Sequence, residues 1–142
     1  MADDLGFDTC VNFVIDALEG GDALVVDPGG KTRFGISTKS HPTISIEELT
    51  RQEAVDIYYE QYWKPAGCDL LSWPFNLVTF DTAVNQGVSQ AVQLRLASQT
   101  WSQMILGRID RYAHLADTKP DLAKYFRGWV NRCITLYKRA KV

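Results

Sequence analysis

The sequence contains little that could bind a metal ion or cross-link the chain. Of its 142 residues, three are cysteine and two are histidine. Cys10, Cys68 and Cys133 lie far apart and form no Cys-x-x-Cys pair, which argues against a disulfide scaffold and against a zinc knuckle. With only His41 and His114 as imidazole ligands, we expect no metal site and no cofactor, and we expect the three cysteines to be free thiols.

A strong net charge and a long apolar run are missing as well. The formal net charge of −2 gives no reason to expect a nucleic-acid partner. The chain starts Met-Ala-Asp-Asp, opposite in charge to a secretory leader, and Asn12 and Asp16 interrupt the apolar stretch that follows. We therefore predict neither a signal peptide nor a membrane span, and we expect a cytoplasmic protein without stable membrane association.

The charge is nevertheless unevenly distributed. Residues 1–60 carry four Lys/Arg against twelve Asp/Glu, whereas residues 101–142 carry nine against three. The excess of positive charge near the C-terminus is either a solvated helix surface or a surface for an anionic polymer. The side chains that would form it are Arg108, Arg111, Lys119, Lys124, Arg127, Lys138, Arg139 and Lys141.

The N-terminal third predicts a helix followed by a small β-hairpin. Apolar residues recur at helical spacing from about Asp4 to Glu19, and the pair Gly20-Gly21 should end that helix. A short strand over residues 23–26 leads into Asp-Pro-Gly-Gly, residues 27–30, with the proline and glycine positions of a type II turn. Residues 32, 34 and 36 then alternate as a second strand.

The remainder predicts helices. Ser45 with Glu48, and Thr50 with Glu53, have the spacing of two capping boxes, the second opening a helix that runs to Trp63. Further helical segments are expected at residues 75–86, 89–101, 102–117 and 122–138. The length fits a single domain spanning residues 1–142, and the layout is an α+β fold that is mostly helical.

Three polar residues flank the predicted hairpin and suit glycoside hydrolysis. Glu19 ends the first helix, where the negative end of the helix dipole disfavours an ionised carboxyl, as a general acid requires. Asp27 opens the turn and can remain ionised beside a water molecule, and the hydroxyl of Thr32 could hold that water from a second direction. Glycosidic cleavage needs an acid on one side of the bond and an activated water or nucleophile on the other.

Each of these residues also has an ordinary structural explanation. Glu19 could be an exposed helix end, Asp27 a turn-forming Asx residue, and Thr32 a plain strand residue. A phosphate-binding loop is rejected, although Gly30-Lys31-Thr32 matches the end of that motif. Val25 stands where its first glycine belongs, and the segment after Thr32 predicts a strand instead of a helix.

Taken together, these motifs resemble glycoside hydrolase family 108, which comprises phage endolysins and related bacterial N-acetylmuramidases. The resemblance rests on Glu19-Gly20-Gly21, on residues 27–32 and on Phe34-Gly35-Ile36. It continues through residues 49–54, Ile57-Tyr58, Tyr62-Trp63, Phe80-Asp81, residues 84–87, Gly128-Trp129 and Arg132. Two features depart from the family pattern: Asp22 replaces the usual aromatic residue, and the loop before Asp27 is about one residue shorter.

The resemblance implies a lysozyme-like fold with the hairpin at the catalytic cleft. It implies a catalytic region over residues 1–88 and a helical, predicted peptidoglycan-binding region over residues 89–142. By similarity to the phage-type lysozymes, Glu19 would be the general acid, Asp27 the second carboxylate and Thr32 the water-positioning residue. Phe34, Asn85 and Gln86 are candidates for binding the sugar, although Asn85 and Gln86 could equally form a helix end. The aromatic residues at 58, 59, 62 and 63 are either core residues or a sugar-stacking wall.

The expected substrate is the β-1,4 bond between N-acetylmuramic acid and N-acetylglucosamine in the glycan strands of peptidoglycan. The resemblance suggests a monomeric endolysin that a holin releases from the host cytoplasm to the cell wall at lysis. Two alternatives remain open: a lytic transglycosylase, which would use Glu19 without Asp27, and a non-catalytic wall-binding protein.

Overall fold

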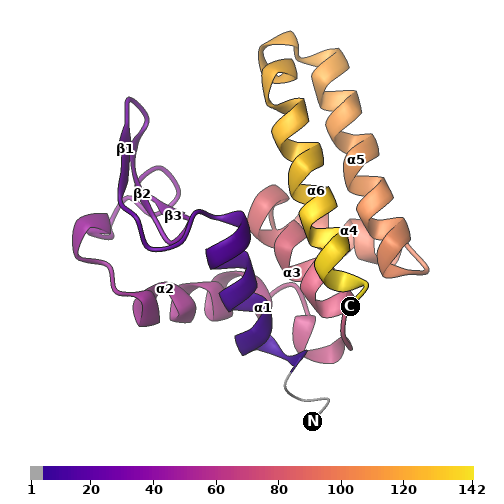
Figure 1. Cartoon of the computed structure of the whole chain (residues 1–142), viewed down its shortest axis with the longest axis horizontal. Coiled ribbons are helices and arrows are strands. Elements are labelled where there is room, and N and C mark those ends of the chain that lie inside the picture. Colours follow the sequence, from indigo (N-terminus) through magenta and orange to yellow (C-terminus); the bar gives the residue numbers. More distant parts are fainter. Residues whose placement is uncertain (1–4) are drawn as a thin grey trace. The chain divides into compact units, whose positions relative to one another are not determined.

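The computed structural model describes residues 5–142, so the predicted start of the first helix at Asp4 lies outside the described residues. The chain divides into two compact units, Met1–Gln61 and Tyr62–Val142. The functional division expected at residues 88 and 89 stays a prediction. Figure 1 shows a mostly helical chain with one small antiparallel sheet, which confirms the predicted α+β class.

In the first unit, helix α1 (Phe7–Phe13) continues directly into a π-helical turn, η2 (Val14–Leu18). Its buried side is formed by Cys10, Val11, Val14 and Ile15. The predicted end of the helix is confirmed, because Gly20 and Gly21 both have a positive φ, of 82° and 72°. Such angles are open to glycine at little cost, and they turn the chain away from the helix axis.

The sheet has three strands where the sequence predicted two. Strands β1 (Val25–Asp27), β2 (Gly30–Arg33) and β3 (Ile36–Ser37) pair antiparallel in that order (Figure 1). The predicted continuous strand through Phe34 is wrong: Phe34 and Gly35 form a tight turn with φ of 54° and 80°, and Arg33 pairs with Ile36. Two consecutive residues with positive φ are typical of a type I′ hairpin turn, which reverses the chain at once.

The first hairpin turn also differs from its prediction. A type II turn requires a positive φ at Gly29, but the positive φ falls on Gly30, at 125°. Asp27 pairs with Gly30, and an Asp27 carboxylate oxygen accepts a hydrogen bond from the Gly29 N–H at 2.9 Å. The Asx interaction therefore shapes this turn more than the preference of Gly29 for positive φ does.

Two helical segments follow, η3 (Ile46–Glu48) and α2 (Arg51–Tyr58), and α2 runs on into the π-helical η4 (Tyr59–Trp63). The capping box at Thr50 and Glu53 is confirmed, since both reciprocal hydrogen bonds form. The one predicted at Ser45 and Glu48 is wrong, because the Ser45 side chain caps nothing. A three-residue 3-10 turn gives a cap little helix to stabilise.

The second unit is built from helices around an apolar core. After η5 (Cys68–Leu70) come α3 (Phe75–Gln86), α4 (Val88–Leu96), α5 (Trp101–Thr118), η6 (Pro120–Tyr125) and α6 (Phe126–Ala140). The bounds predicted for α3 are confirmed, with Gly87 following at φ 97°. Helices α5 and α6 pack side by side (Figure 1). The largest buried core side chains include Trp63, Leu77, Phe80, Met104 and Leu136. Across residues 5–142, no helix is both long and apolar enough to cross a membrane.

Candidate active site

Glu19 lies where the first helix ends. Its backbone N–H closes the π-helical turn by donating to the Val14 carbonyl at 2.9 Å, and the Gly21 N–H donates to the Ile15 carbonyl at 2.8 Å. A π turn contains one more residue than an α turn, so it rotates the residues after it about the helix axis. The local hydrogen bonds therefore fix the direction in which the Glu19 side chain leaves the helix.

The Phe34-Gly35 turn packs against that side chain. A Cβ atom built on Gly35 would lie 2.8 Å from Cβ and 2.9 Å from Cγ of Glu19, closer than real Cβ atoms approach other heavy atoms. The same position would also collide with the Tyr58 hydroxyl. Only glycine leaves room there. The Phe34 N–H donates to the Gly21 carbonyl at 3.2 Å, which ties the turn to the segment that follows Glu19.

Tyr58 holds the turn from the core of the unit. Its hydroxyl donates to the Phe34 carbonyl at 2.7 Å, and the residue is 1% exposed. The sequence left open whether the aromatic residues at 58, 59, 62 and 63 are core residues or a sugar-stacking wall. Tyr58 and Trp63 are both core residues. Sequence reasoning missed that Gly35 lies against both Glu19 and Tyr58. Gly35 and Tyr58 belong to the motifs that resemble the family. Spacing along the chain does not reveal which turn packs against the end of a helix.

Asp27 and Thr32 occupy the β1–β2 hairpin. The register pairs Asp27 with Gly30 and Val25 with Thr32, so Asp27 and Thr32 are two residue pairs apart and their side chains project from the same face of the sheet. Asp27 is exposed and its carboxylate accepts the Gly29 N–H, which is the turn-forming role the sequence left open. A carboxylate has lone pairs for further partners, so this bond does not prevent it from orienting a water molecule.

Phe34 is 4% exposed and sits at positive φ, so it contributes mainly backbone and a buried ring to this region. Its predicted contact with sugar stays a prediction. Arg33 is the last residue of β2 and anchors that strand. Its Nε donates to the Asp22 carbonyl at 2.9 Å, and a terminal nitrogen donates to the Glu47 carbonyl at 3.1 Å. Asp22, the residue that departs from the family pattern, thus supports β2 through its backbone.

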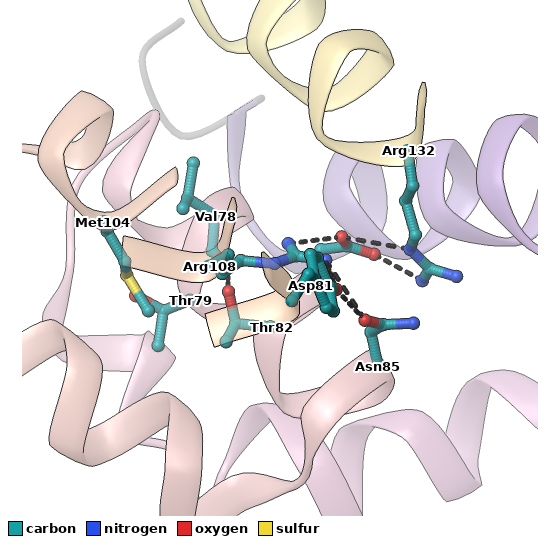
Figure 2. Close-up of polar contacts among 9 residues, drawn as sticks. Val78, Thr79, Asp81, Thr82, Asn85, Met104, Arg108 and Arg132 are labelled. Atoms are coloured by element: carbon teal, nitrogen blue, oxygen red, sulfur yellow. Dashed lines mark hydrogen bonds and ion pairs between the residues drawn. The ribbon is translucent and has the colours of Figure 1, made fainter. Parts of the chain in front are cut away.

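Asn85 and Gln86 lie in the second unit, at the end of α3. The Asn85 Oδ1 accepts hydrogen bonds from Arg108, at 3.4 Å, and from the Tyr112 hydroxyl (Figure 2). These two donors fix the orientation of the amide, whose nitrogen points away from the cluster (Figure 2). Both polar atoms of the Gln86 amide are buried and make no hydrogen bond with any residue that the structure describes.

A fully buried carboxylate organises this cluster. Asp81 accepts from Arg108 at 2.8 Å and from Arg132 at 2.6 Å, and the Asp81 and Arg108 side chains are 0% exposed (Figure 2). Burial alone would raise the pKa of Asp81, but the two guanidinium groups outweigh it and hold that pKa below its ordinary value. The cluster joins α3, α5 and α6, so it is primarily a structural element of the second unit.

The expectation that Arg108 belongs to an exposed basic surface is therefore wrong. Arg108 is buried and neutralised by Asp81. The other members of the predicted set, Arg111, Lys119, Lys124, Arg127, Lys138, Arg139 and Lys141, are exposed or partly exposed. The sequence could not separate these two groups, because an arginine inside a helix looks the same whether it faces solvent or a carboxylate. Within residues 5–142, no cluster of three or more His, Cys, Asp or Glu residues could hold a metal ion.

Comparison with known proteins decides the family. The profile described as Glycosyl hydrolase 108 matches residues 11–87, more than half of the chain. The chain belongs to glycosyl hydrolase family 108. The matched segment contains every candidate site residue, from Glu19 to Gln86. Membership of this family makes the protein a glycoside hydrolase, and it confirms the resemblance read from the sequence.

The fold has a counterpart among solved structures. The chain is similar to the structure of Brucella abortus SagA, with a TM-score of 0.73 and 25% sequence identity over 94% of this chain and 92% of that chain. A search of curated proteins gave no significant match. The family and the shared lysozyme-like fold together support a lysozyme-like peptidoglycan hydrolase.

Proposed function

We propose that this family 108 protein is an N-acetylmuramidase that hydrolyses the β-1,4 bond between N-acetylmuramic acid and N-acetylglucosamine in peptidoglycan. The observation that carries the proposal is the placement of Glu19, whose side chain is packed against Gly35 at the end of a π-helical turn. A carboxyl that is confined in this way can deliver a proton to a bound glycosidic oxygen repeatedly from one direction.

The proposed roles follow the chemistry of inverting hydrolysis. The Glu19 carboxyl gives its proton to the oxygen of the leaving sugar, and a water molecule attacks the anomeric carbon from the opposite side. The Asp27 carboxylate takes the proton that this water loses, while the Thr32 hydroxyl holds the water. The shared face of Asp27 and Thr32 on the hairpin supports a joint action on one water.

Substrate binding is assigned to Phe34, Asn85 and Gln86 as part of the same proposal. The Asn85 oxygen is already occupied by Arg108 and Tyr112, so its amide group would act toward a sugar as a donor alone. Such a donor suits an acceptor oxygen, as in the carbonyl of an N-acetyl group. The unpartnered amide of Gln86 supports a role in binding for this end of α3.

The biological role that we infer is that of a phage endolysin, which lyses the host from within and has antimicrobial activity against it. The support is the similarity of the sequence to the endolysins of this family. Under this proposal the protein acts as a monomer, gathers in the host cytoplasm and reaches the wall when a holin opens the membrane.

One observation favours a second candidate. The Asp27 carboxylate shapes its own turn through the Gly29 N–H, which would suffice to explain an aspartate there. A lytic transglycosylase would need Glu19 as both acid and base and would leave Asp27 to this structural role.

Mass analysis of the products released from purified peptidoglycan tests these proposals. Hydrolysis leaves a reducing N-acetylmuramic acid end, whereas transglycosylation leaves an anhydro end that is lighter by one water. Reducing ends support the muramidase, and anhydro ends would replace it by the transglycosylase. Wall binding without any released product would identify a non-catalytic binding protein and overturn both.

A further inference from the structure

We propose that Gly35 and Tyr58 are positioning residues for the Glu19 carboxyl. The Phe34-Gly35 turn, held by the core of the first unit, fixes the direction in which this carboxyl points. This inference rests on the proposed function of Glu19. It goes further by assigning a positioning role to two residues outside the proposed set of Glu19, Asp27 and Thr32.

The need for lateral support comes from the local sequence. Glu19 is followed by two glycines with positive φ, and the helix that precedes it ends at Leu18. A side chain at such a chain end has considerable freedom unless neighbouring groups restrict it. A catalytic group must be held within about 0.5 Å and 10–20° of its productive geometry.

Gly35 confines the first two carbons of the Glu19 side chain. Its Cα leaves a slot into which Cβ and Cγ of Glu19 fit, and an added methyl group would fall within 2.9 Å of both atoms. The same methyl position also collides with the Tyr58 hydroxyl, so Glu19 and Tyr58 flank the same point of the backbone. The fit fails with any side chain at position 35, and the φ of 80° adds a backbone penalty for every residue other than glycine.

Tyr58 fixes the turn itself. Phe34 has a φ of 54°, a conformation that bulky residues adopt only when the surroundings enforce it. The Tyr58 hydroxyl enforces it by donating to the Phe34 carbonyl at 2.7 Å, from a side chain that is 1% exposed. Tyr58 of α2 therefore holds the turn through its hydroxyl, and Gly35 of the turn packs against the carbons of Glu19.

The test compares Tyr58→Phe with wild type on soluble fragments of peptidoglycan glycan strands. We expect kcat to fall about 10- to 100-fold with KM changed less than about twofold, because a displacement near 1 Å has effects of this size. The alkaline limb of the kcat/KM profile, which reports the acid of the free enzyme, should also move, because the surroundings of the Glu19 carboxyl change. The side-chain carbon-13 resonances of Glu19 should shift as well, in the absence of any substrate.

Two matched controls separate positioning from general damage. Tyr125→Phe also removes a tyrosine hydroxyl, from a half-exposed residue of the second unit, and should change none of these readouts. Gly67→Ala pays the same backbone penalty as Gly35→Ala, with φ of 76° against 80°, but its new methyl meets only an ordinary contact at 3.8 Å. We expect Gly35→Ala to lose about 100-fold in kcat and Gly67→Ala to lose only stability.

A double variant distinguishes this inference from the proposal on which it rests. If Tyr58 acts through Glu19, adding Tyr58→Phe to Glu19→Gln lowers the residual rate no further. If Tyr58→Phe lowers the residual rate of Glu19→Gln by the same factor by which it lowers the wild-type rate, the positioning role is overturned, while Glu19 remains the acid. Wild-type rates, pH profile and Glu19 resonances in Tyr58→Phe overturn it too, even if Gly35→Ala fails to fold. Wild-type activity in Glu19→Gln overturns the proposed function and this inference together.

Discussion

Asp81 and Arg132 are 51 residues apart in the sequence, yet the Arg132 guanidinium donates to the Asp81 carboxylate at 2.6 Å. Arg108 reaches the other oxygen of the same carboxylate, and neither Asp81 nor Arg108 has any exposed side-chain surface. A buried charge of this kind is tolerated only when partners neutralise it. The second unit therefore depends on one carboxylate for the electrostatic balance of three helices.

Asp81→Asn should destabilise the protein strongly. The change leaves two guanidinium groups without their counter-charge, one of them fully buried, and breaking such a pair costs about 3–5 kcal/mol. Urea unfolding at neutral pH measures the loss, with the exposed Asp110→Asn as the matched control. A difference of less than about 1 kcal/mol between the two variants contradicts the structural role of Asp81.

The same carboxylate predicts how stability depends on pH. The pKa of Asp81 is lower in the folded state than in the unfolded chain, so the unfolded state binds the proton more readily. Its contribution to the free energy of unfolding is therefore complete above the unfolded-state pKa, near 4, and is lost as the pH falls through the folded-state value. Urea unfolding of wild type from pH 7 to pH 2 should show this loss, and Asp81→Asn should show a shallower one.

Glu19→Gln should abolish most of the activity while preserving the fold. Glutamine keeps the shape of the side chain but has no acidic proton to donate, and general acid catalysis contributes about 10²–10⁴-fold. Release of soluble fragments from peptidoglycan measures the loss, and circular dichroism checks the fold. Glu60→Gln, a substitution on an exposed residue of η4, is the control and should retain full activity.

Asp27 and Thr32 predict the stereochemistry of the product. If they hold the attacking water opposite the acid, the reaction inverts the anomeric centre, with the two carboxyl groups roughly 6.5–9.5 Å apart in the working enzyme. Proton NMR of the first-formed sugar reports the anomer directly, and a retained β product is incompatible with these roles. Thr32→Ser should be milder than Thr32→Val, because only serine keeps the hydroxyl.

The three cysteines should behave as unreactive thiols until the protein unfolds. Cys10, Cys68 and Cys133 are all buried, and none of the three is in a disulfide. Burial also raises the pKa of the Cys133 thiol, so less of the reactive thiolate is present at neutral pH. Thiol titration without reductant should count three groups in denaturant and react slowly in the native protein. A count of one in denaturant would reveal a disulfide.

The exposed cations of the C-terminal helices could hold the enzyme on its anionic substrate. We expect sedimentation with purified sacculi to weaken as salt rises, because salt screens exposed charges over about 8 Å at physiological strength. Lys124→Glu with Arg127→Glu should reduce binding more than Lys39→Glu with Lys64→Glu, an equal change of charge elsewhere on the chain. Equal effects of the two pairs would leave the basic surface with no role beyond solvation.

Local signals in the sequence determined much of the first unit and most helices. The glycines after Glu19, the capping box at Thr50 and Glu53, and Gly87 after α3 all act within a few residues, and the structure contains each as predicted. Propensity alone failed in the Phe34-Gly35 turn. The alternation of residues 32, 34 and 36 predicted a strand, but the hydrogen bond from Tyr58 holds Phe34 at a positive φ that no local preference supplies.

The candidate catalytic residues could be named from the sequence because their spacing around the hairpin is local. What surrounds them could not, since contacts between residues 19, 35 and 58 depend on how α1, the turn and α2 pack. The burial of Arg108 could not be predicted for the same reason. The sequence determined that a basic residue stands on α5, and only the tertiary structure decided that it faces Asp81 instead of solvent, because burial and charge pairing are properties of the packed helices.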